Sequence, residues 1–429
     1  MKLTVINNLY PPYIVGGYEI LARDVIEALR LRGHHVDVIT GRGSDLPRDS
    51  FTHGVLDLDL DRKDESFLGG RTPTPLDAWR WHVYSRRSHV AVSRLLHELQ
   101  PDLVVVWNLY MASMAPLVAA RQSGIPLVVN IADKWMISGL HDVSPLIRPS
   151  RWRAPFVGLA RAVVQPLLRR ASRPDHIIAV SEFMRREYQK AGFDGTIETI
   201  HLGVPLGRFA PGHPSPSGSG VRFLFVGSLW EGKGPQVAIR ALARVVQQPG
   251  NHAATLDIYG DGATGFVEFL KALIREHQLE DRVTLRGFVS RNDLPDIYRS
   301  HDVLLFPSVW DEPFAAVPLE GMASGLPVVG STAGGTPEAI SDNETGLLVP
   351  PGDVAALAGA MLRLAGDPAM RARLGERAAQ AVRERWSFER YVDRLESRFQ
   401  ELVNRPLARA MPRGRASVDP GLATRRSDA

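Results

Sequence analysis

Two glutamates eight positions apart, Glu312 and Glu320, are well suited to bind a ligand with several hydroxyl groups. A carboxylate offers paired acceptor oxygens, which match the adjacent hydroxyls of a sugar or a ribose. A small-residue turn with Gly334 and Gly335 follows them. Glycines let backbone N–H groups approach an anion, and a helix N-terminus adds a favourable dipole. Together these features predict a site for hydroxyls and phosphate, as in a nucleotide sugar.

The elements around these residues follow a βαβ pattern. An apolar run at 302–306 predicts a buried strand, and prolines on both sides of Glu312 place it on a loop. Residues 315–324 predict a helix, and 327–330 predict the next strand. Ligands of such units bind at the carboxyl ends of the strands. The alternative is an ordinary surface loop with a solvated Glu320, but the order of all these features favours a site.

The segment from Glu312 to Val329, EPFAAVPLEGMASGLPVV, resembles the E-x7-E region of the retaining glycosyltransferases of family 4. That family has the GT-B fold, in which two doubly wound, Rossmann-like α/β domains face each other across a cleft. The resemblance extends to about residue 402. It implies that the second domain binds a nucleotide sugar, that the first binds the acceptor, and that a C-terminal helix crosses back to the first domain.

A loop after a predicted strand at 221–226 resembles the family's G-R-L-x-x-x-K-G segment, whose Arg and Lys hold the diphosphate of the donor. Lys233 occupies the lysine position, whereas Ser228 replaces the arginine. We therefore expect Lys233 to neutralise the leaving group, with help from loop N–H groups. The resemblance implies a donor site made of Gly16, Gly17, Gly227, Ser228, Lys233, Gly287, Phe288, Val289, Glu312, Pro313, Phe314, Ala315, Ala316, Glu320, Gly334 and Gly335.

The first domain supplies fewer candidates. Gly16 and Gly17 stand between a predicted strand and a predicted helix, and they resemble the family's N-terminal Gly-Gly loop. A predicted strand at 126–130 leads to Ala132 and Asp133, where many family members have His-Asp. The family histidine is thus replaced. Asp133 lies at a strand's carboxyl end and joins Lys233 and Glu312 as a catalytic candidate, with an ordinary surface turn as the alternative.

Three aspartates, Asp57, Asp59 and Asp61, alternate with leucines. They fit either a metal-binding D-x-D motif or a half-buried strand with an acidic face, and the period of two favours the strand. No histidine spacing indicates a metal site. We therefore expect no metal and no cofactor, with Lys233 and loop dipoles neutralising the diphosphate.

Composition and length bound the class of protein. The 429 residues allow two domains, each with its own core. The absence of cysteine excludes disulfides, thiolate metal sites and a cysteine nucleophile, which fits the cytoplasm. No apolar run reaches the length of a signal-peptide core or a membrane span.

A stretch rich in Gly, Ser and Pro marks a linker between the two predicted domains. The predicted organisation is a first domain at 1–205, a linker at 206–220, a second domain at 221–385, a returning helix at 386–403 and a disordered basic tail at 404–429.

Two basic segments suggest an anionic membrane surface as a partner. Residues 148–173 contain seven arginines and no acid, and the tail has six arginines and two aspartates, a balance that equals the net charge of +4. The first segment fits an amphipathic helix at the inner membrane face or a helix packed on its own domain. Both readings stay open, because Pro166 interrupts the pattern. Nucleic acid is not expected as a partner, since no aromatic residues are interleaved with the charges.

The resemblance thus implies a retaining glycosyltransferase of the hexosyltransferase type, which we expect to be metal-independent. It would move a sugar from a UDP-, GDP- or ADP-sugar to a glycan or lipid-linked acceptor in the synthesis of cell-surface polysaccharide or glycolipid. One alternative is a GT-B nucleotide-sugar epimerase or phosphorylase that uses the same phosphate site. Another is a non-catalytic GT-B nucleotide-sugar-binding protein, suggested by Ala132 and Ser228.

Overall fold

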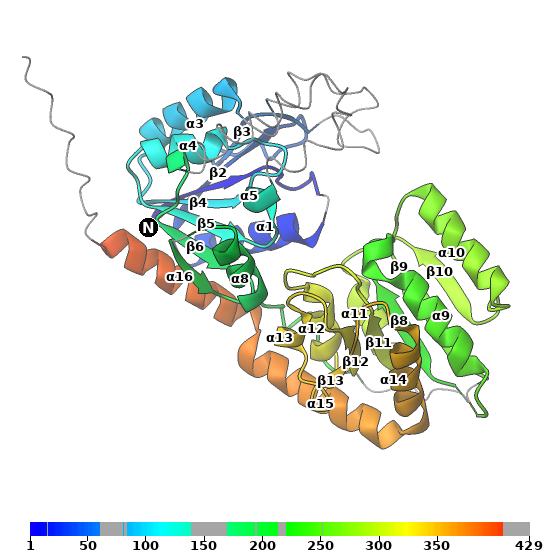
Figure 1. The fold of residues 1–429 in the computed structure, drawn as a ribbon. Coiled ribbons are helices and arrows are strands. Elements are labelled where there is room, and N and C mark those ends of the chain that lie inside the picture. Colours follow the sequence, from blue (N-terminus) through cyan, green and yellow to red (C-terminus); the bar gives the residue numbers. More distant parts are fainter. Residues whose placement is uncertain are drawn as a thin grey trace, which may run out of the picture.

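The structure is a computed structural model that describes residues 1–14, 16–60, 80, 84–138, 170–193, 195–212, 220–250 and 252–405. These residues form two α/β domains, each built on one parallel sheet (Figure 1). The Asp61 position, most of the basic segment 148–173, the centre of the predicted linker and the tail beyond residue 405 lie outside the described residues.

The first sheet has seven parallel strands within the described residues, in the order β3-β2-β1-β4-β5-β6-β7. Its central strands are continuous apolar runs, and residues 104–106 are fully buried, as expected for a sheet covered on both faces. The strands are β1 (Lys2–Asn7), β2 (His35–Arg42), β3 (Thr52–Asp59), β4 (Leu103–Asn108), β5 (Leu127–Ile131), β6 (His176–Ala179) and β7 (Thr196–Thr199). The helices are α1 (Gly17–Leu31), α3 (Arg86–Leu99), α4 (Ala115–Gln122), α5 (Trp135–Ser138) and α8 (Glu182–Lys190).

The second sheet has six parallel strands in the described chain, in the order β10-β9-β8-β11-β12-β13. They are β8 (Arg222–Val226), β9 (Thr255–Tyr259), β10 (Val283–Gly287), β11 (Val303–Phe306), β12 (Val328–Ser331) and β13 (Gly346–Val349). A short 3-10 turn, η1 (Glu231–Lys233), precedes α9 (Pro235–Val246). The other helices of this half are α10 (Thr264–Glu276), α11 (Leu294–Arg299), α12 (Ala316–Ala323), α13 (Thr336–Ala339), α14 (Val354–Gly366) and α15 (Pro368–Arg385).

The strand order reverses once in each sheet, between β1 and β4 in the first and between β8 and β11 in the second. In doubly wound sheets, ligands bind beyond the carboxyl ends of the strands at such a reversal. The two sheets confirm the predicted pair of doubly wound domains, and the reversals point to the loops that follow these four strands.

The last helix, α16 (Phe388–Asn404), returns to the first domain (Figure 1). Its Asp393 and Glu396 pair with Arg32 of the first domain at 2.8 and 2.6 Å. Arg398 pairs with Glu198 of β7. The predicted crossing of the C-terminal helix is therefore confirmed. In the described part of the chain, none of the helices combines the length and apolarity that a bilayer crossing requires.

Candidate active site

Lys233 and Glu312, predicted as catalytic from two separate motifs, form an ion pair. The lysine Nζ lies 2.8 Å from Oε1 and 2.9 Å from Oε2 of the glutamate. The Glu312 side chain is only 4% exposed, whereas that of Lys233 is 25% exposed. Ser308 Oγ donates a further hydrogen bond to Oε1 at 2.6 Å. These partners compensate the burial of the carboxylate and fix the position of the ammonium.

Backbone contacts hold the loop of Lys233 against the loop that follows β11. The N–H of Trp310 donates to the carbonyl of Gly232 at 3.0 Å. Gly234 has φ +77°, and a Cβ there would lie 2.1 Å from the carbonyl oxygen of Pro307. A side chain at this position would separate the two loops. The close approach of β8 and β11 thus explains why the pair forms at the strand reversal.

The Gly334–Gly335 turn packs directly on the Glu312 loop. The N–H of Gly335 donates to the Glu312 carbonyl at 2.6 Å. Gly334 has φ +58°, and a Cβ there would lie 2.2 Å from that same oxygen; at Gly335 a Cβ would lie 2.3 Å from Pro313 O. These glycines are therefore needed to seat the Glu312 loop. Their predicted contact with a phosphate stays a prediction.

Glu320, on α12, bonds to a different partner. Its Oε2 accepts a hydrogen bond from the Tyr298 hydroxyl at 2.9 Å, and both residues are buried. Burial raises the pKa of Glu320 above its usual range, against the opposing effects of Arg291, the Tyr298 hydroxyl and Arg208. The predicted contact of Glu320 with a ribose stays a prediction.

Replacing Glu320 with alanine should weaken donor binding by about 1.5–3 kcal/mol, because a charged acceptor of two ribose hydroxyls is lost. Titration calorimetry with the donor measures this change. Tyr298→Phe is the matched control, since it removes the buried hydroxyl partner and keeps the carboxylate. Unchanged donor affinity in Glu320→Ala, or an equal loss in Tyr298→Phe, would take Glu320 out of the nucleotide site.

Of residues 314–316, which follow Glu312 closely, one is buried in the core and two are partly exposed to solvent. Phe314 is buried, and its ring lies 4.8 Å from that of His201 and 6.5 Å from that of Trp386, measured between centroids. Its side chain is thus used for packing, and its predicted contact with the donor stays a prediction. Ala315 and Ala316 remain partly exposed at the start of α12.

The other predicted donor-binding positions of the second domain lie at strand ends. Gly227 follows β8 and donates its N–H to Tyr259 O at 3.0 Å, and Ser228 beside it is exposed. At the end of β10, the carbonyl of Gly287 accepts from the N–H of Gly260 at 2.8 Å. Phe288 is 80% exposed, and the Val289 position is partly exposed.

In the first domain, Asp133 lies just beyond β5. Its Oδ1 accepts the N–H of Trp135 at 2.8 Å, and its Oδ2 lies 3.4 Å from Nδ2 of Asn108 at the end of β4. Burial raises the pKa of Asp133 to about 6; the Trp135 N–H opposes the rise, and Glu19 adds to it. A carboxyl group with a raised pKa beside a strand reversal is a candidate functional group.

The predicted donor contact of the Gly16–Gly17 loop stays a prediction, and one of its N–H groups is bonded within the loop and α1. The N–H of Gly16 donates to Oε2 of Glu19 at 2.8 Å, so a carboxylate of the same helix already occupies this donor. Gly17 is the first residue of α1. The hydrogen bonds of Asp133 and Gly16 stay within the first domain.

Asp57 of the alternating acidic run lies on β3, where Leu56 and Leu58 are buried. The strand predicted from the alternation is present. Asp57 accepts a hydrogen bond from Ser85 at 2.9 Å and pairs with Arg42 at 3.1 Å. The carboxylate thus has protein partners that account for its position.

Comparisons with known proteins identify the family of the chain. The model of Glycosyltransferase Family 4 matches residues 15–208, and that of Glycosyl transferases group 1 matches residues 215–381. A glycogen synthase of Mycobacterium tuberculosis is 28% identical over 400 residues, which cover 90% of each chain. A D-inositol 3-phosphate glycosyltransferase of Acidothermus cellulolyticus is 28% identical over 393 residues, or 86% of this chain and 83% of the relative.

Solved structures share the architecture. Sucrose-phosphate synthase from Thermosynechococcus elongatus has a TM-score of 0.72 at 22% identity, covering 94% of this chain and 98% of that one. HepE of Anabaena in complex with UDP-glucose has a TM-score of 0.66 at 19% identity, covering 94% and 100%. The fold is that of GT-B glycosyltransferases. The chain belongs to the family 4 glycosyltransferases, whose two models together match most of its length.

Proposed function

We propose that this enzyme transfers a hexose from a nucleotide sugar to a glycan or lipid-linked acceptor, with retention of the anomeric configuration and without a metal. The observation that supports it most strongly is the Lys233–Glu312 pair, held on the loops that follow β8 and β11 at the strand reversal. Synthesis of cell-surface polysaccharide or glycolipid is the proposed setting.

The ion pair suits a diphosphate leaving group. An ammonium has three N–H donors, and two of those of Lys233 are directed to the oxygens of Glu312, which leaves one for a phosphate oxygen. Negative charge grows on the diphosphate as the bond to the anomeric carbon breaks. A fixed ammonium therefore stabilises the transition state more than the ground state.

The proposed step is a displacement on one face of the sugar. The acceptor oxygen forms a bond to the anomeric carbon while the bond from that carbon to the phosphate oxygen breaks. A phosphate oxygen of the leaving group takes the proton of the acceptor hydroxyl. Atoms and charge balance without a covalent enzyme intermediate, and the configuration is retained.

The donor is proposed as a nucleoside-diphosphate sugar. A structural neighbour, HepE, is described in complex with UDP-glucose, which supports uracil as the first base to test. A thermal-shift screen of UDP-, GDP- and ADP-sugars identifies the base, because a ligand at 100 times its Kd stabilises the folded state by about 2.7 kcal/mol.

Product analysis then tests the reaction itself. With donor and acceptor present, the expected product is a glycoside whose anomeric proton coupling in NMR matches that of the donor. Epimerised sugar from donor alone, or sugar phosphate formed with inorganic phosphate, would instead indicate the epimerase or phosphorylase. Donor binding without turnover on any glycan or lipid acceptor would indicate a binding protein.

If the acceptor is membrane-bound, we expect the protein to bind anionic vesicles through residues 148–173. Most of these residues lie outside the described part of the chain. Each cation near such a surface contributes about 1 kcal/mol. Changing Arg161, Arg169 and Arg170 to Gln should reduce vesicle flotation, as should added salt. Both measurements use a chain truncated after Leu402, so that the basic tail cannot contribute to vesicle binding. If this truncated chain does not float with anionic vesicles at low salt, a soluble acceptor is favoured.

A further inference from the structure

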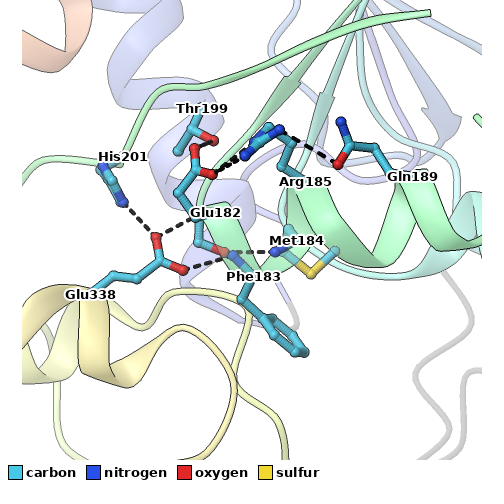
Figure 2. Close-up of polar contacts among 9 residues, drawn as sticks. Glu182, Phe183, Met184, Arg185, Gln189, Thr199, His201 and Glu338 are labelled. Carbon is cyan, nitrogen blue, oxygen red and sulfur yellow. Dashed lines mark hydrogen bonds and ion pairs between the residues drawn. The ribbon is translucent and has the colours of Figure 1, made fainter. Parts of the chain in front are cut away.

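Glu338 is a second-domain carboxylate that belongs to none of the predicted donor-site positions, and it lies at the N-terminus of the first-domain helix α8 (Figure 2). Its Oε2 accepts the backbone N–H of Glu182 at 2.7 Å, and its Oε1 accepts that of Phe183 at 2.7 Å. His201, also in the first domain, lies 2.8 Å from Oε2 through its Nε2. One side chain thus makes three contacts across the domain boundary.

These contacts complete the N-terminus of α8. A helix leaves its first N–H groups without partners inside the helix, and a negative charge there is favourable. Glu338 takes the first two, and Ser181 Oγ accepts the third, from Met184, at 3.1 Å.

The carboxylate of Glu182, the acid in the first turn of α8 itself, is engaged elsewhere. It accepts hydrogen bonds from Arg185 Nε at 2.8 Å and from the hydroxyl of Thr199 (Figure 2). The carboxylate that accepts the first two backbone N–H groups of this first-domain helix is therefore supplied by the other domain. The stabilisation from these two hydrogen bonds is gained only when the two domains are docked.

The same helix end also contacts the Glu312 loop. Ser181 donates its hydroxyl to the carbonyl of Pro313 at 2.5 Å. On the other side, the Gly335 N–H donates to Glu312 O, and a Cβ at Gly335 would lie 3.2 Å from that of Ser181. Glu338 follows this turn by three residues. The loop that carries Glu312 and the turn beneath it are thus both fastened to α8.

We propose that Glu338 is a positioning residue for glycosyl transfer: it docks α8 onto the second domain beside Glu312, and so sets the acceptor-binding domain relative to the donor loop. This inference rests on the proposed transfer between the two domains. Reacting groups held on separate domains need close alignment, and a displacement of about 1 Å can cost on the order of a hundredfold in rate. Charge-assisted hydrogen bonds give the directional contact that such alignment requires.

Glu338→Gln tests the proposal with little change of shape. The amide has no charge and can present only one oxygen to two N–H groups. We expect kcat for transfer to fall at least about tenfold, while the donor Kd stays within about twofold, because Glu338 is not part of the donor site. Hydrolysis of the donor should rise relative to transfer. Glu338→Asp, which keeps the charge, should recover part of the rate.

Glu344→Gln is the matched control, because it neutralises an exposed glutamate six residues further along the same domain. It should leave kcat and the donor Kd unchanged. Ser181→Ala is a second probe that removes the hydroxyl bond to Pro313 and keeps Glu338. It should shift the balance between hydrolysis and transfer in the same direction. If Glu338→Gln raises the donor Kd as it lowers kcat, or lowers only the melting temperature, the positioning role is wrong.

An activity-independent measurement separates this inference from the proposed function. The chain contains no cysteine, so spin labels can be attached to cysteines introduced at His97 and Glu280, exposed positions of the first and second domains. The distance distribution between them should broaden in Glu338→Gln and stay narrow in Glu344→Gln. An unchanged distribution would overturn the docking role, even if transfer itself is confirmed. Absence of transfer with the broadening present would overturn the proposed reaction alone.

Discussion

Replacing Lys233 with alanine should lower kcat at least about a hundredfold, with a smaller rise of the donor KM. The ammonium is held 2.8 Å from a buried carboxylate and therefore has a fixed position, from which we propose that it contacts the leaving group. Ser228 stands where the family has an arginine, so that position supplies no second cation. Steady-state kinetics at saturating acceptor separate kcat from KM.

Lys233→Ala should also lower stability, and this effect must be separated from the loss of activity. Without Lys233, the buried Glu312 keeps Ser308 but loses its cation, and breaking such a pair costs about 3–5 kcal/mol when it is buried. In the double variant Lys233→Ala/Glu312→Gln the unpaired charge is removed, so stability should recover while activity does not. Lys271→Ala is the control, because it removes an exposed lysine paired with Glu268 on α10.

Chelation of metal ions tests whether the reaction depends on a metal instead of Lys233. A metal-independent reaction should keep its rate in EDTA. If EDTA abolishes activity and Lys233→Ala hardly matters, a metal ion neutralises the diphosphate and the proposed role of Lys233 is wrong.

The features that could be predicted from sequence are those set by local pattern. Apolar runs such as 103–106 and 302–306 predict buried parallel strands, because both faces of such strands are covered. Lys233 and Glu312 were assigned from separate loops, and their pairing follows from the adjacency of β8 and β11. Ser181 follows a buried strand and is of a residue type that caps helices; in the structure it accepts the N–H of Met184 at the start of α8.

The contacts across the domain boundary could not be predicted in the same way. Glu338 lies more than 150 residues from the helix end that it binds, and no local pattern distinguishes it from a solvated glutamate. A carboxylate one turn after a Gly-Gly turn was the available signal. Ser308 and Tyr298 were missed for the same reason, since each becomes significant only through a buried glutamate distant in sequence. The Gly-Gly turn was assigned to an anion, whereas its packing on the Glu312 loop appears only in three dimensions.

Asp133→Asn should make the protein more stable at neutral pH and less active. Burial raises the pKa of Asp133 from 3.8 to about 6 in the folded state, so the folded protein binds more protons than the unfolded chain between these values. Stability contributed by the protonated group is therefore lost as pH rises through this window. A shift of about 2 units corresponds to a cost of roughly 3 kcal/mol above pH 6, as an upper limit.

Asparagine is neutral at every pH and keeps an oxygen for the N–H of Trp135. Urea unfolding at pH 7.5 should thus show a gain of up to about 3 kcal/mol for Asp133→Asn, and at pH 4 the gain should vanish, because Asp133 is then protonated in the folded state. Asp59→Asn is the control, because it makes the same substitution at an exposed carboxylate of the same domain.

The activity of Asp133→Asn shows whether the ionised carboxylate, which lowers stability, is needed for the reaction. A carboxylate kept ionised in spite of its desolvation, at the expense of stability, is expected at a functional site, where the charge is used. We expect kcat/KM of the unmodified enzyme to rise with pH through an apparent pKa near 6, and Asp133→Asn to remove this limb and to lower the rate at pH 7.5 by about a hundredfold or more. A variant that is more stable and fully active would make Asp133 a residue of an ordinary turn. In that case Asp133 would not take over the role of the family histidine that Ala132 replaces.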